Sequence, residues 1–404
     1  MAGRSGRAPR ADLGVDFWWI AAASTLTCLV TGTSTPLLAR FAREHLGAPA
    51  GLVGVIVGAS SIGAIVLRPW FGRLADERGR RRVGIVGSVG IAAGAGVLIL
   101  AHDPATGTLG RMLMGLTGGA ANTAMMAWTI ELAPIEQRGR ALGLFGVSIW
   151  IGLAVGPQIG QMLLSAGGYT LLWCGCGAMG LCAAGCLLAT GPTPRHASAP
   201  RRRRGPGGRD GMRLIRLVLR PGLSSMLAWA AEGTVLAFLA EHLERRGLPA
   251  GGLSGAATVF TVFAISVIGS RLALSRLVDE VGAVRAAVWA LVAVAAGLVI
   301  LALAHSFGVA AAGAVLLGLG YAPLYPSLAV LASEPVAAHE RARGIGIFSS
   351  FQDVGVALGS AGGGVIVAAA GTEAALLTVA AAQVVAILLL VPGSGSSRAS
   401  APDS

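Results

Sequence analysis

The chain has 404 residues, of which 54% are hydrophobic and only 12% are charged. This balance leaves too little polar surface to cover a soluble body of this length, so it excludes an ordinary soluble protein and indicates a bilayer protein. The net charge is +12, and the 31 basic residues are all arginines. Because the phosphate-binding Walker motif needs a lysine, the composition also excludes an ATP-driven pump within this chain.

Twelve apolar stretches are long enough to cross a membrane. A helix rises about 1.5 Å per residue, so about 20 apolar residues span a hydrocarbon core of about 30 Å. We therefore expect an all-α integral membrane protein with twelve transmembrane helices. Six stretches lie near residues 17–38, 51–71, 83–101, 107–131, 141–165 and 170–190, and six near 222–240, 251–274, 284–304, 308–332, 344–369 and 373–391.

The two halves of the chain repeat one another. The polar sequence Gly72–Arg82 returns as Ser275–Arg285, each time directly after an apolar stretch. An unchanged register over several segments is the mark of an internal repeat, so we expect two pseudo-symmetric six-helix bundles. The spacing along the sequence between these two copies also separates Arg68 from Arg271 and Gly143 from Gly346. A slightly shorter spacing relates FAREHL, which begins at Phe41, to FLAEHL, which begins at Phe238.

Arginines gather on one side of the twelve-span arrangement. By the positive-inside rule this side is cytoplasmic, so both termini are expected inside a multi-pass protein of the cell inner (plasma) membrane. The first apolar stretch has the full length of a span, so we expect it to remain in the protein rather than act as a cleaved signal peptide. The opposite side carries only Arg40, Arg43, Arg245 and Arg246.

The repeat divides the chain into an N-terminal six-helix bundle (1–190), a basic cytoplasmic linker (191–221), a C-terminal six-helix bundle (222–392) and a cytoplasmic tail (393–404). The linker contains many arginines and no aromatic residue for base stacking. Anionic lipids of the inner leaflet are therefore a better partner than nucleic acid. Leucines alternate with arginines over residues 212–220, as in a short interfacial helix.

A loop signature follows the second predicted span, and a degenerate copy follows the eighth. The first copy holds Gly72, Asp76, Gly79, Arg80 and Arg81, and the second keeps Asp279. This spacing resembles the loop signature of the major facilitator superfamily, the twelve-helix secondary transporters, and the resemblance covers nearly the whole chain. It implies a cytoplasmic latch between the two halves; an ordinary positively charged inner loop is the alternative.

Arg111 lies inside the fourth predicted span and precedes Gly115, Gly118 and Gly119. Ionisable residues within a membrane are costly and indicate function, and small neighbours leave space around the charge. The resemblance implies a part in proton movement, because a cation makes a neighbouring acid easier to deprotonate. The alternative is an arginine that extends to the outer membrane surface.

The fifth predicted span carries a glycine and proline pattern. The glycines of this span form a stripe that permits close helix contact, and Pro157 removes a backbone donor and bends the helix. The pattern resembles the signature of exporters within the family, although Gln161 stands where a second glycine is usual, and Ser360 replaces the proline in the second half. Its residues are Gly143, Gly152, Gly156, Pro157 and Gly160.

Two acids lie within predicted spans, Glu232 in the seventh and Asp353 in the eleventh. A carboxyl group held away from water can carry a proton near neutral pH and release it when the site opens. We therefore expect Glu232, Asp353 and Arg111 to take part in proton coupling. Polar and aromatic residues inside spans indicate either a cavity or helix packing; as lining of a substrate cavity they are Thr27, Thr31, Asn122, Trp150, Gln158, Trp229, Tyr321, Tyr325 and Gln352.

These patterns predict a monomeric, proton-coupled exporter of a drug or metabolite that works by alternating access. An importer or facilitator of a sugar, organic acid or metabolite with the same fold remains the alternative. A membrane-embedded transferase or a sensor is more remote, since the six histidines are scattered and no sizeable soluble domain is evident. The cysteines lie inside spans without histidine or acidic ligands nearby, so we expect neither a metal site nor a cofactor.

Overall fold

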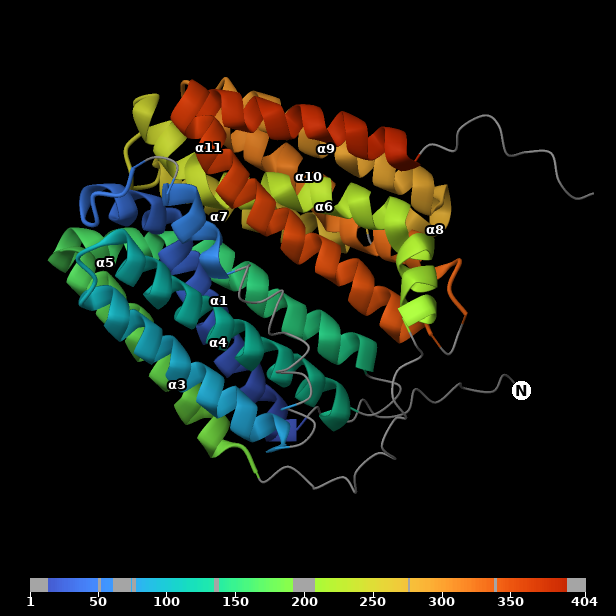
Figure 1. Ribbon diagram of the computed structural model, residues 1–404, viewed down its shortest axis with the longest axis horizontal. Coiled ribbons are helices and arrows are strands. Elements are labelled where there is room, and N and C mark those ends of the chain that lie inside the picture. Colours follow the sequence, from blue (N-terminus) through green and yellow to red (C-terminus); the bar gives the residue numbers. More distant parts are fainter. Residues whose placement is uncertain are drawn as a thin grey trace, which may run out of the picture.

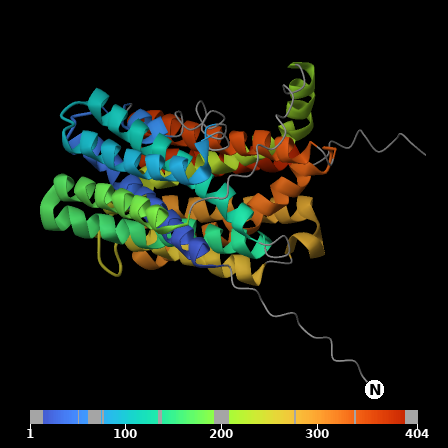
Figure 2. The ribbon, with the colours of Figure 1, turned by 90° about the horizontal axis from the view of Figure 1, so that it is seen from below.

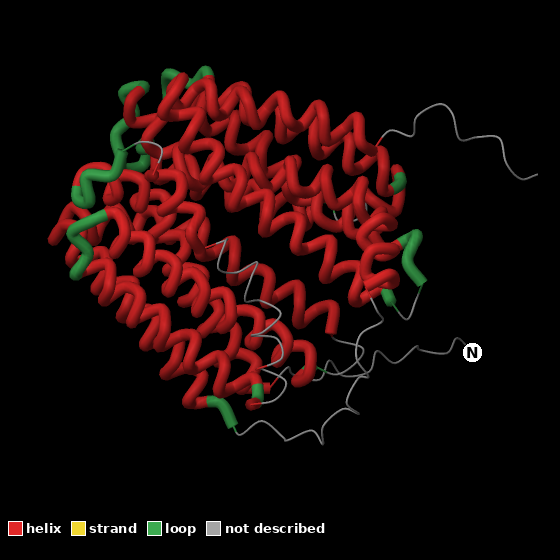
Figure 3. Tube along the Cα trace, viewed as in Figure 1, coloured by secondary structure: helices red, strands yellow, loops and turns green. Residues whose placement is uncertain are grey.

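The computed structural model describes residues 14–49, 52–60, 74, 78–133, 138–191, 208–274, 277–337 and 340–390. These residues form helices joined by short turns, and no strand occurs among them (Figure 3). Residues 52–60 are also helical. The named helices are α1 (Gly14–Glu44), α3 (Arg80–Ile99), α4 (Pro104–Leu132), α5 (Arg138–Ala189), α6 (Gly208–Arg245), α7 (Ala256–Ala273), α8 (Leu277–Val281), α9 (Ala283–Ala302), α10 (Phe307–Ser333) and α11 (Arg341–Leu390).

Eight helices in this part of the chain are long and apolar enough to cross a membrane. Two of them contain a break at glycine: α5 departs from helical geometry at Gly167 and Gly168, and α11 does so at Gly371. Each of these two helices therefore accounts for two of the predicted spans. With α4, which has 29 residues, and the helical residues 52–60, the arrangement is consistent with the predicted twelve helices.

The helices form two bundles (Figure 1). One contains α1, α3, α4 and α5, and the other contains α6, α7, α9, α10 and α11. We call the end that carries Gly47, Gly247 and Gly371 the outer end, following the orientation predicted from the arginines, and the end near α8 the inner end. In Figure 1 the bundles meet at their outer ends and lie further apart at their inner ends.

Equivalent helices begin in the same way in the two halves. Gly79 precedes α3 with a φ of +90°, and Gly282 precedes α9 with a φ of +84°. Residues with a Cβ atom rarely adopt a positive φ, so both positions require glycine. The two residues occupy matching places in the repeated loop, and the structure thus gives this part of both loop copies the same backbone conformation.

Glycines allow the first and fifth spans of each half to approach closely. A Cβ atom on Gly156 of α5 would come within 2.6 Å of the Gly32 backbone in α1. In the second half, a Cβ atom on Gly359 of α11 would overlap the backbone of Ala230 in α6. The helix pairs α1–α5 and α6–α11 are therefore the closely packed centres of the two bundles.

The predicted interfacial segment is continuous with the next span. Residues 212–220 lie in the first part of α6, which contains Pro221 and runs on to Arg245. Figure 2 shows the first turns of α6 at a steep angle to the remainder. Leu214 and Val218 are buried, whereas Arg213, Arg216 and Arg220 are exposed. The segment is amphipathic and is not a separate helix, while its location at the membrane surface stays a prediction.

Candidate functional site

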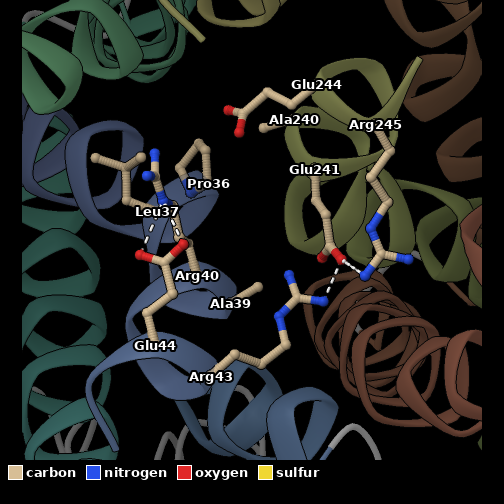
Figure 4. Close-up of a pocket in the computed structure, with 10 residues that line it drawn as sticks. All are labelled: Pro36, Leu37, Ala39, Arg40, Arg43, Glu44, Ala240, Glu241, Glu244 and Arg245. Carbon is tan, nitrogen blue, oxygen red and sulfur yellow. Dashed lines mark hydrogen bonds and ion pairs between the residues drawn. The ribbon is translucent and has the colours of Figure 1, made fainter. Parts of the chain in front are cut away.

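The outer ends of α1 and α6 are joined by charged side chains around a pocket of about 400 Å³. Arg43 of α1 forms an ion pair with Glu241 of α6, which also binds Arg245 at 2.6 Å (Figure 4). The Arg43–Glu241 pair crosses between the two bundles. Glu241 and Arg43 side chains are only 13% and 26% exposed, so water screens this pair less than a surface pair. The lining residues are Pro36, Leu37, Ala39, Arg40, Arg43, Glu44, Ala240, Glu241, Glu244 and Arg245.

A second contact between the bundles joins α5 to α7. Gln158 donates a hydrogen bond to Thr258 Oγ1 at 2.8 Å, and the Thr261 hydroxyl donates to the Ala154 carbonyl. Further toward the inner end, Trp150 packs edge-on against Phe263. The described contact between α5 and α7 therefore extends from the outer ends to about the middle of the bundles.

A third contact joins residues 52–60 to α11. A Cβ atom on Gly54 would lie 2.6 Å from the Ser360 carbonyl oxygen, and one on Gly364 would lie 2.7 Å from the Gly54 Cα. Gly58 approaches the Ser360 hydroxyl in the same way. The described contacts between the bundles thus concentrate toward their outer ends.

Aromatic rings form a continuous chain from the interface into the C-terminal bundle. Successive ring centroids lie 5.8–6.4 Å apart, a range in which aromatic pairs attract one another. The chain crosses α5, α7, α10, α6 and α11. In order, it contains Trp150 to Phe263 at 5.9 Å, Phe263 to Tyr321 at 5.8 Å, Tyr321 to Trp229 at 5.9 Å, Trp229 to Tyr325 at 6.4 Å, and Tyr325 to Phe348 at 6.1 Å.

Glu232 lies on α6 one turn after Trp229, beside this aromatic chain, and is half-buried. Within the described residues it forms no ion pair. Tyr321 is buried, and its hydroxyl donates to the Ala228 carbonyl at 2.8 Å, so it braces α10 against α6 near the acid. A half-buried carboxyl group beside aromatic rings can exchange a proton without first breaking a salt bridge.

Asp353 lies on the other member of the α6–α11 pair. It is half-buried and stands between Phe351, which meets Gly222 of α6, and Gly355, which meets Met226. Its neighbour Gln352 is 9% exposed, and the Gln352 side-chain nitrogen has no hydrogen-bond partner in the described structure. The two embedded acids therefore belong to the same closely packed helix pair.

Arg111 is buried inside the N-terminal bundle and is 5% exposed. Its guanidinium donates to Thr35 Oγ1 of α1 at 3.1 Å, while its Nε atom lacks a partner among the described residues. The residue thus stays within the bundle and does not extend to the membrane surface. The glycines beside it do not leave an open crevice throughout, because Ser60 packs on Gly115 and Ile91 on Gly118.

The other predicted lining residues take different positions. The Thr27 hydroxyl bonds to the Ala23 carbonyl of its own helix, and Asn122 accepts a hydrogen bond from Ser24 at 3.2 Å. Thr31 and Tyr325 are exposed. The structure brings Trp150, Trp229, Tyr321 and Tyr325 together in one chain of rings, and it uses Gln158 for contact between the bundles. Whether any of them binds substrate stays a prediction.

The arginines of the predicted latch that the structure describes make contacts within the N-terminal bundle. Arg80 binds Glu131 of α4 at 2.7 Å, and Arg81 donates to the carbonyls of Leu187 and Leu188 in α5. These contacts hold the inner ends of the N-terminal helices together in this arrangement. Gly72 and Asp76 lie outside the described residues; Asp279 lies in α8, without a described side chain.

The glycine and proline pattern lies in the first part of α5, as predicted. Gly152, Gly156 and Gly160 each face the backbone or side chains of α1, and Pro157 is buried. Gly143 is helical. The close packing expected of the stripe is therefore present, while its role in export stays a prediction.

Sequence reasoning did not single out four residues of this interface: Glu241, Phe263, Arg271 and Phe348. The repeat of FAREHL and FLAEHL marks the position of Glu241, because Glu44 and Glu241 are equivalent. Arg271 was visible only as the repeat partner of Arg68. Phe348 stands out only as the repeat partner of Phe145, and nothing in the sequence pattern distinguishes Phe263 from other apolar core residues. Among the described residues, no group of three or more His, Cys, Asp or Glu could hold a metal ion.

Comparisons with known proteins agree on one family. The sequence matches the family described as Major Facilitator Superfamily over residues 20–298 and 222–403. It is 28% identical over 344 residues to an uncharacterised MFS-type transporter of Salmonella typhimurium, which covers 83% of this chain and 85% of that protein. A similar transporter of Burkholderia pseudomallei is 26% identical over 343 residues, covering 83% and 81%.

Solved structures show the same fold. The nucleoside transporter NupG superposes with a TM-score of 0.77 at 14% identity, covering 93% of this chain and 98% of that chain. A bacterial homologue of the human lysosomal transporter Spinster, in an inward-facing and unoccupied conformation, superposes with a TM-score of 0.73 at 14% identity, covering 95% and 97%. At these identities the likeness shows the fold alone.

Proposed function

Because the chain belongs to the Major Facilitator Superfamily, we propose that this multi-pass membrane protein is a secondary transporter that exports a small molecule in exchange for protons. The observation that supports this most directly is the placement of Glu232. The half-buried carboxyl group lies beside a chain of aromatic rings that begins at the contact between the bundles. A proton-binding group and apolar surface for a substrate therefore adjoin one another.

The proposed cycle uses the two bundles as rocking bodies. When the inner ends are apart, Glu232 releases its proton to the cytoplasmic side and substrate enters along the aromatic rings. When the outer contacts break and the inner ends close, the acid is protonated from outside and substrate leaves. Asp353, on the partner helix of the same pair, is proposed as the second proton-binding group. Arg111 is proposed as a buried cation of the N-terminal bundle that takes part in proton movement.

The driving force is sufficient with one proton. One charge moving through about 100 mV provides about 2.3 kcal/mol, which corresponds to a concentration ratio of roughly fifty for an uncharged substrate. A single titrating acid would therefore support useful export. We further propose an inner-membrane protein with both termini in the cytoplasm, a basic linker near anionic lipids, and a monomer as the functional unit.

The decisive experiment measures proton movement in sealed vesicles that contain the purified protein. A library of drugs and metabolites is applied, and compounds that are transported are tested for proton movement in the opposite direction. We expect such coupling in the wild type and its loss in Glu232→Gln, with substrate exchange retained because the variant resembles the protonated acid.

Glu131→Gln is the matched control, because Glu131 pairs with Arg80 at the inner end of the N-terminal bundle, away from the aromatic rings. Transport by the wild type without any proton movement would refute antiport. Proton and substrate movement in the same direction would instead support the importer alternative. Unchanged coupling in Glu232→Gln would exclude the proposed role of that acid.

A further inference from the structure

Arg271 occupies an unusual place in the contact between the bundles. It lies in the last turn of α7, inside a helix long and apolar enough to span the membrane. Its guanidinium carbon lies 5.4 Å from the ring centroid of Trp150, which belongs to α5 in the other bundle. Trp150 is roughly 18 Å along α5 from Arg138, at about 1.5 Å per residue. The charge therefore lies at the inner limit of the α5–α7 contact, within the length of the predicted span.

The surroundings of Arg271 place it beside the aromatic chain. Trp150 begins that chain, and Tyr325 of α10 lies near the guanidinium. Tyr325 in turn contacts Trp229 of α6 at 6.4 Å between ring centroids. Arg271 and Tyr325 are exposed, and Trp229 is half-buried, so part of this surface remains accessible.

Arg271 differs from the other described arginines of the spans in its partners. Arg43 and Arg80 each bind a carboxylate, and the buried Arg111 donates to a threonine hydroxyl. Arg271 has only the face of an aromatic ring; among the described residues it forms no ion pair and no hydrogen bond. A ring face attracts a cation but offers its N–H groups no oxygen acceptor, so the donors of Arg271 have no hydrogen-bond acceptor among the described residues.

A cation inside a membrane protein is costly unless an opposite charge accompanies it. We propose that the missing acceptor is the substrate, and that Arg271 binds its anionic group. The Arg271 fork suits a carboxylate or a sulfonate, while Trp229 and Tyr325 offer ring faces for a flat apolar body. The substrate class is therefore an organic anion with an aromatic or similarly flat group. This inference rests on the proposed transport function and names its cargo.

The charge of such a cargo fits the proposed direction. An anion leaving the cell and a proton entering it both move in the direction favoured by an inside-negative potential. Arg271 thus assigns the anion-binding role to the second half of the repeat, in the same bundle as Glu232. Its repeat partner Arg68 lies outside the described residues.

The test uses three naphthalene probes of similar shape and different charge: 1-naphthoate, 1-naphthamide and 1-naphthylmethylammonium. Binding to the purified full-length protein in lipid nanodiscs is measured by calorimetry and by quenching of tryptophan fluorescence. We expect the wild type to bind naphthoate at least about tenfold more tightly than naphthamide, as for one charge-assisted hydrogen bond, and to bind the ammonium probe most weakly.

Arg271→Gln should abolish the preference for naphthoate over naphthamide, and Arg271→Lys should keep part of it. Arg285→Gln is the matched control: Arg285 is an exposed arginine near the start of α9, so its loss removes the same charge and should leave the preference intact. Size-exclusion profiles of all variants report whether they fold. The preference of the wild type for naphthoate over naphthamide is measured without any variant, so it tests the inference even if a variant fails to fold.

Several results would overturn the inference. The first is a wild type that binds naphthamide or the ammonium probe as tightly as naphthoate, and the second is a wild type that binds no naphthalene probe. The third is an equal loss of naphthoate and naphthamide binding in Arg271→Gln, which would indicate that Arg271 only joins the bundles through Trp150. Equilibrium binding requires no proton gradient, so a failure of proton coupling in vesicles would count against the proposed antiport and leave this measurement valid.

Discussion

The α1–α5 pair and the α6–α11 pair occupy equivalent places in the two halves, yet they carry different chemistry. Both pairs pack through glycines that face the backbone of the neighbouring helix. The middle of α1 offers hydroxyl groups, including Thr31, Thr33 and Ser34, whereas α6 holds Glu232. At a matching position of the fifth spans, Trp150 corresponds to Asp353. The two halves therefore share the glycine-mediated packing of these helix pairs, whereas Glu232 and Asp353 both lie in the second half.

The largest effect on stability is expected where the α1–α5 and α6–α11 pairs pack through glycine, and it tests whether the two pairs are equally closely packed. Gly359→Ala would overlap the Ala230 carbonyl, and Gly156→Ala would bring its Cβ within 2.6 Å of Gly32. We expect each to destabilise the protein by about 1–3 kcal/mol through overpacking, with the larger loss for Gly359→Ala. Thermal unfolding in detergent, followed by tryptophan fluorescence, measures both.

Gly362→Ala is the control within the same helix, because nothing lies within 4 Å of its added Cβ. It should be neutral or slightly stabilising, since alanine favours a helix over glycine by up to about 1 kcal/mol. An equal loss in Gly362→Ala would show that these helices need glycine for flexibility rather than for close contact.

A comparable effect is expected where equivalent acids differ in their partners. Glu44 binds Arg40 of its own helix at 2.9 Å, whereas the equivalent Glu241 binds Arg43 across the bundles. Removing a charge-assisted hydrogen bond of about 1.5–3 kcal/mol should increase the outward-open population roughly tenfold or more. Glu241→Gln should therefore open the outer pocket, and Glu44→Gln should not.

The measurement is the rate at which a membrane-impermeant maleimide labels Ala240→Cys in a background without the native cysteines. Ala240 lines the pocket and is 8% exposed, so labelling reports its opening. Equal labelling in Glu241→Gln and Glu44→Gln would show that the cross-bundle pair does not hold the outer side closed.

The smallest effect concerns the starts of α4 and α10, which are also equivalent. Asp103 accepts hydrogen bonds from the backbone N–H groups of Thr106 and Ala105, while Ser306 makes no side-chain cap to α10. Donation by Thr106 lowers the pKa of Asp103. Because the folded pKa is the lower one, the stabilisation is present above the unfolded pKa and is lost as the pH falls through the folded value.

Hydrogen exchange at the Thr106 and Gly107 amides measures this difference. Asp103→Ala should speed exchange at neutral pH and have little effect at a pH below the folded pKa. Ser306→Ala should leave exchange at the start of α10 unchanged. A slower exchange in Asp103→Ala, or no difference from the wild type at neutral pH, would contradict the capping role.

The fold class was accessible from the sequence because a membrane leaves few alternatives to apolar helices. The breaks at Gly168 and Gly371 fall where short outer loops were predicted, and the repeat-related Gly79 and Gly282 have the same backbone conformation. Periodicity does not specify which helix faces meet. The stacking of Arg271 on Trp150 and the Arg43–Glu241 pair join residues far apart in the chain, so only the tertiary structure brings them together.

The charged pocket at the outer end has a consequence for the response to voltage. Three arginines and three glutamates line it, so their formal charges cancel (Figure 4). A neutral group of charges that moves through the membrane field does almost no electrical work. The charges on α1 sum to +1 and those on α6 to −1, so an opening that parts the two helices within the membrane plane would carry little gating charge. The membrane potential would then act on the transported ions rather than on the outer closure.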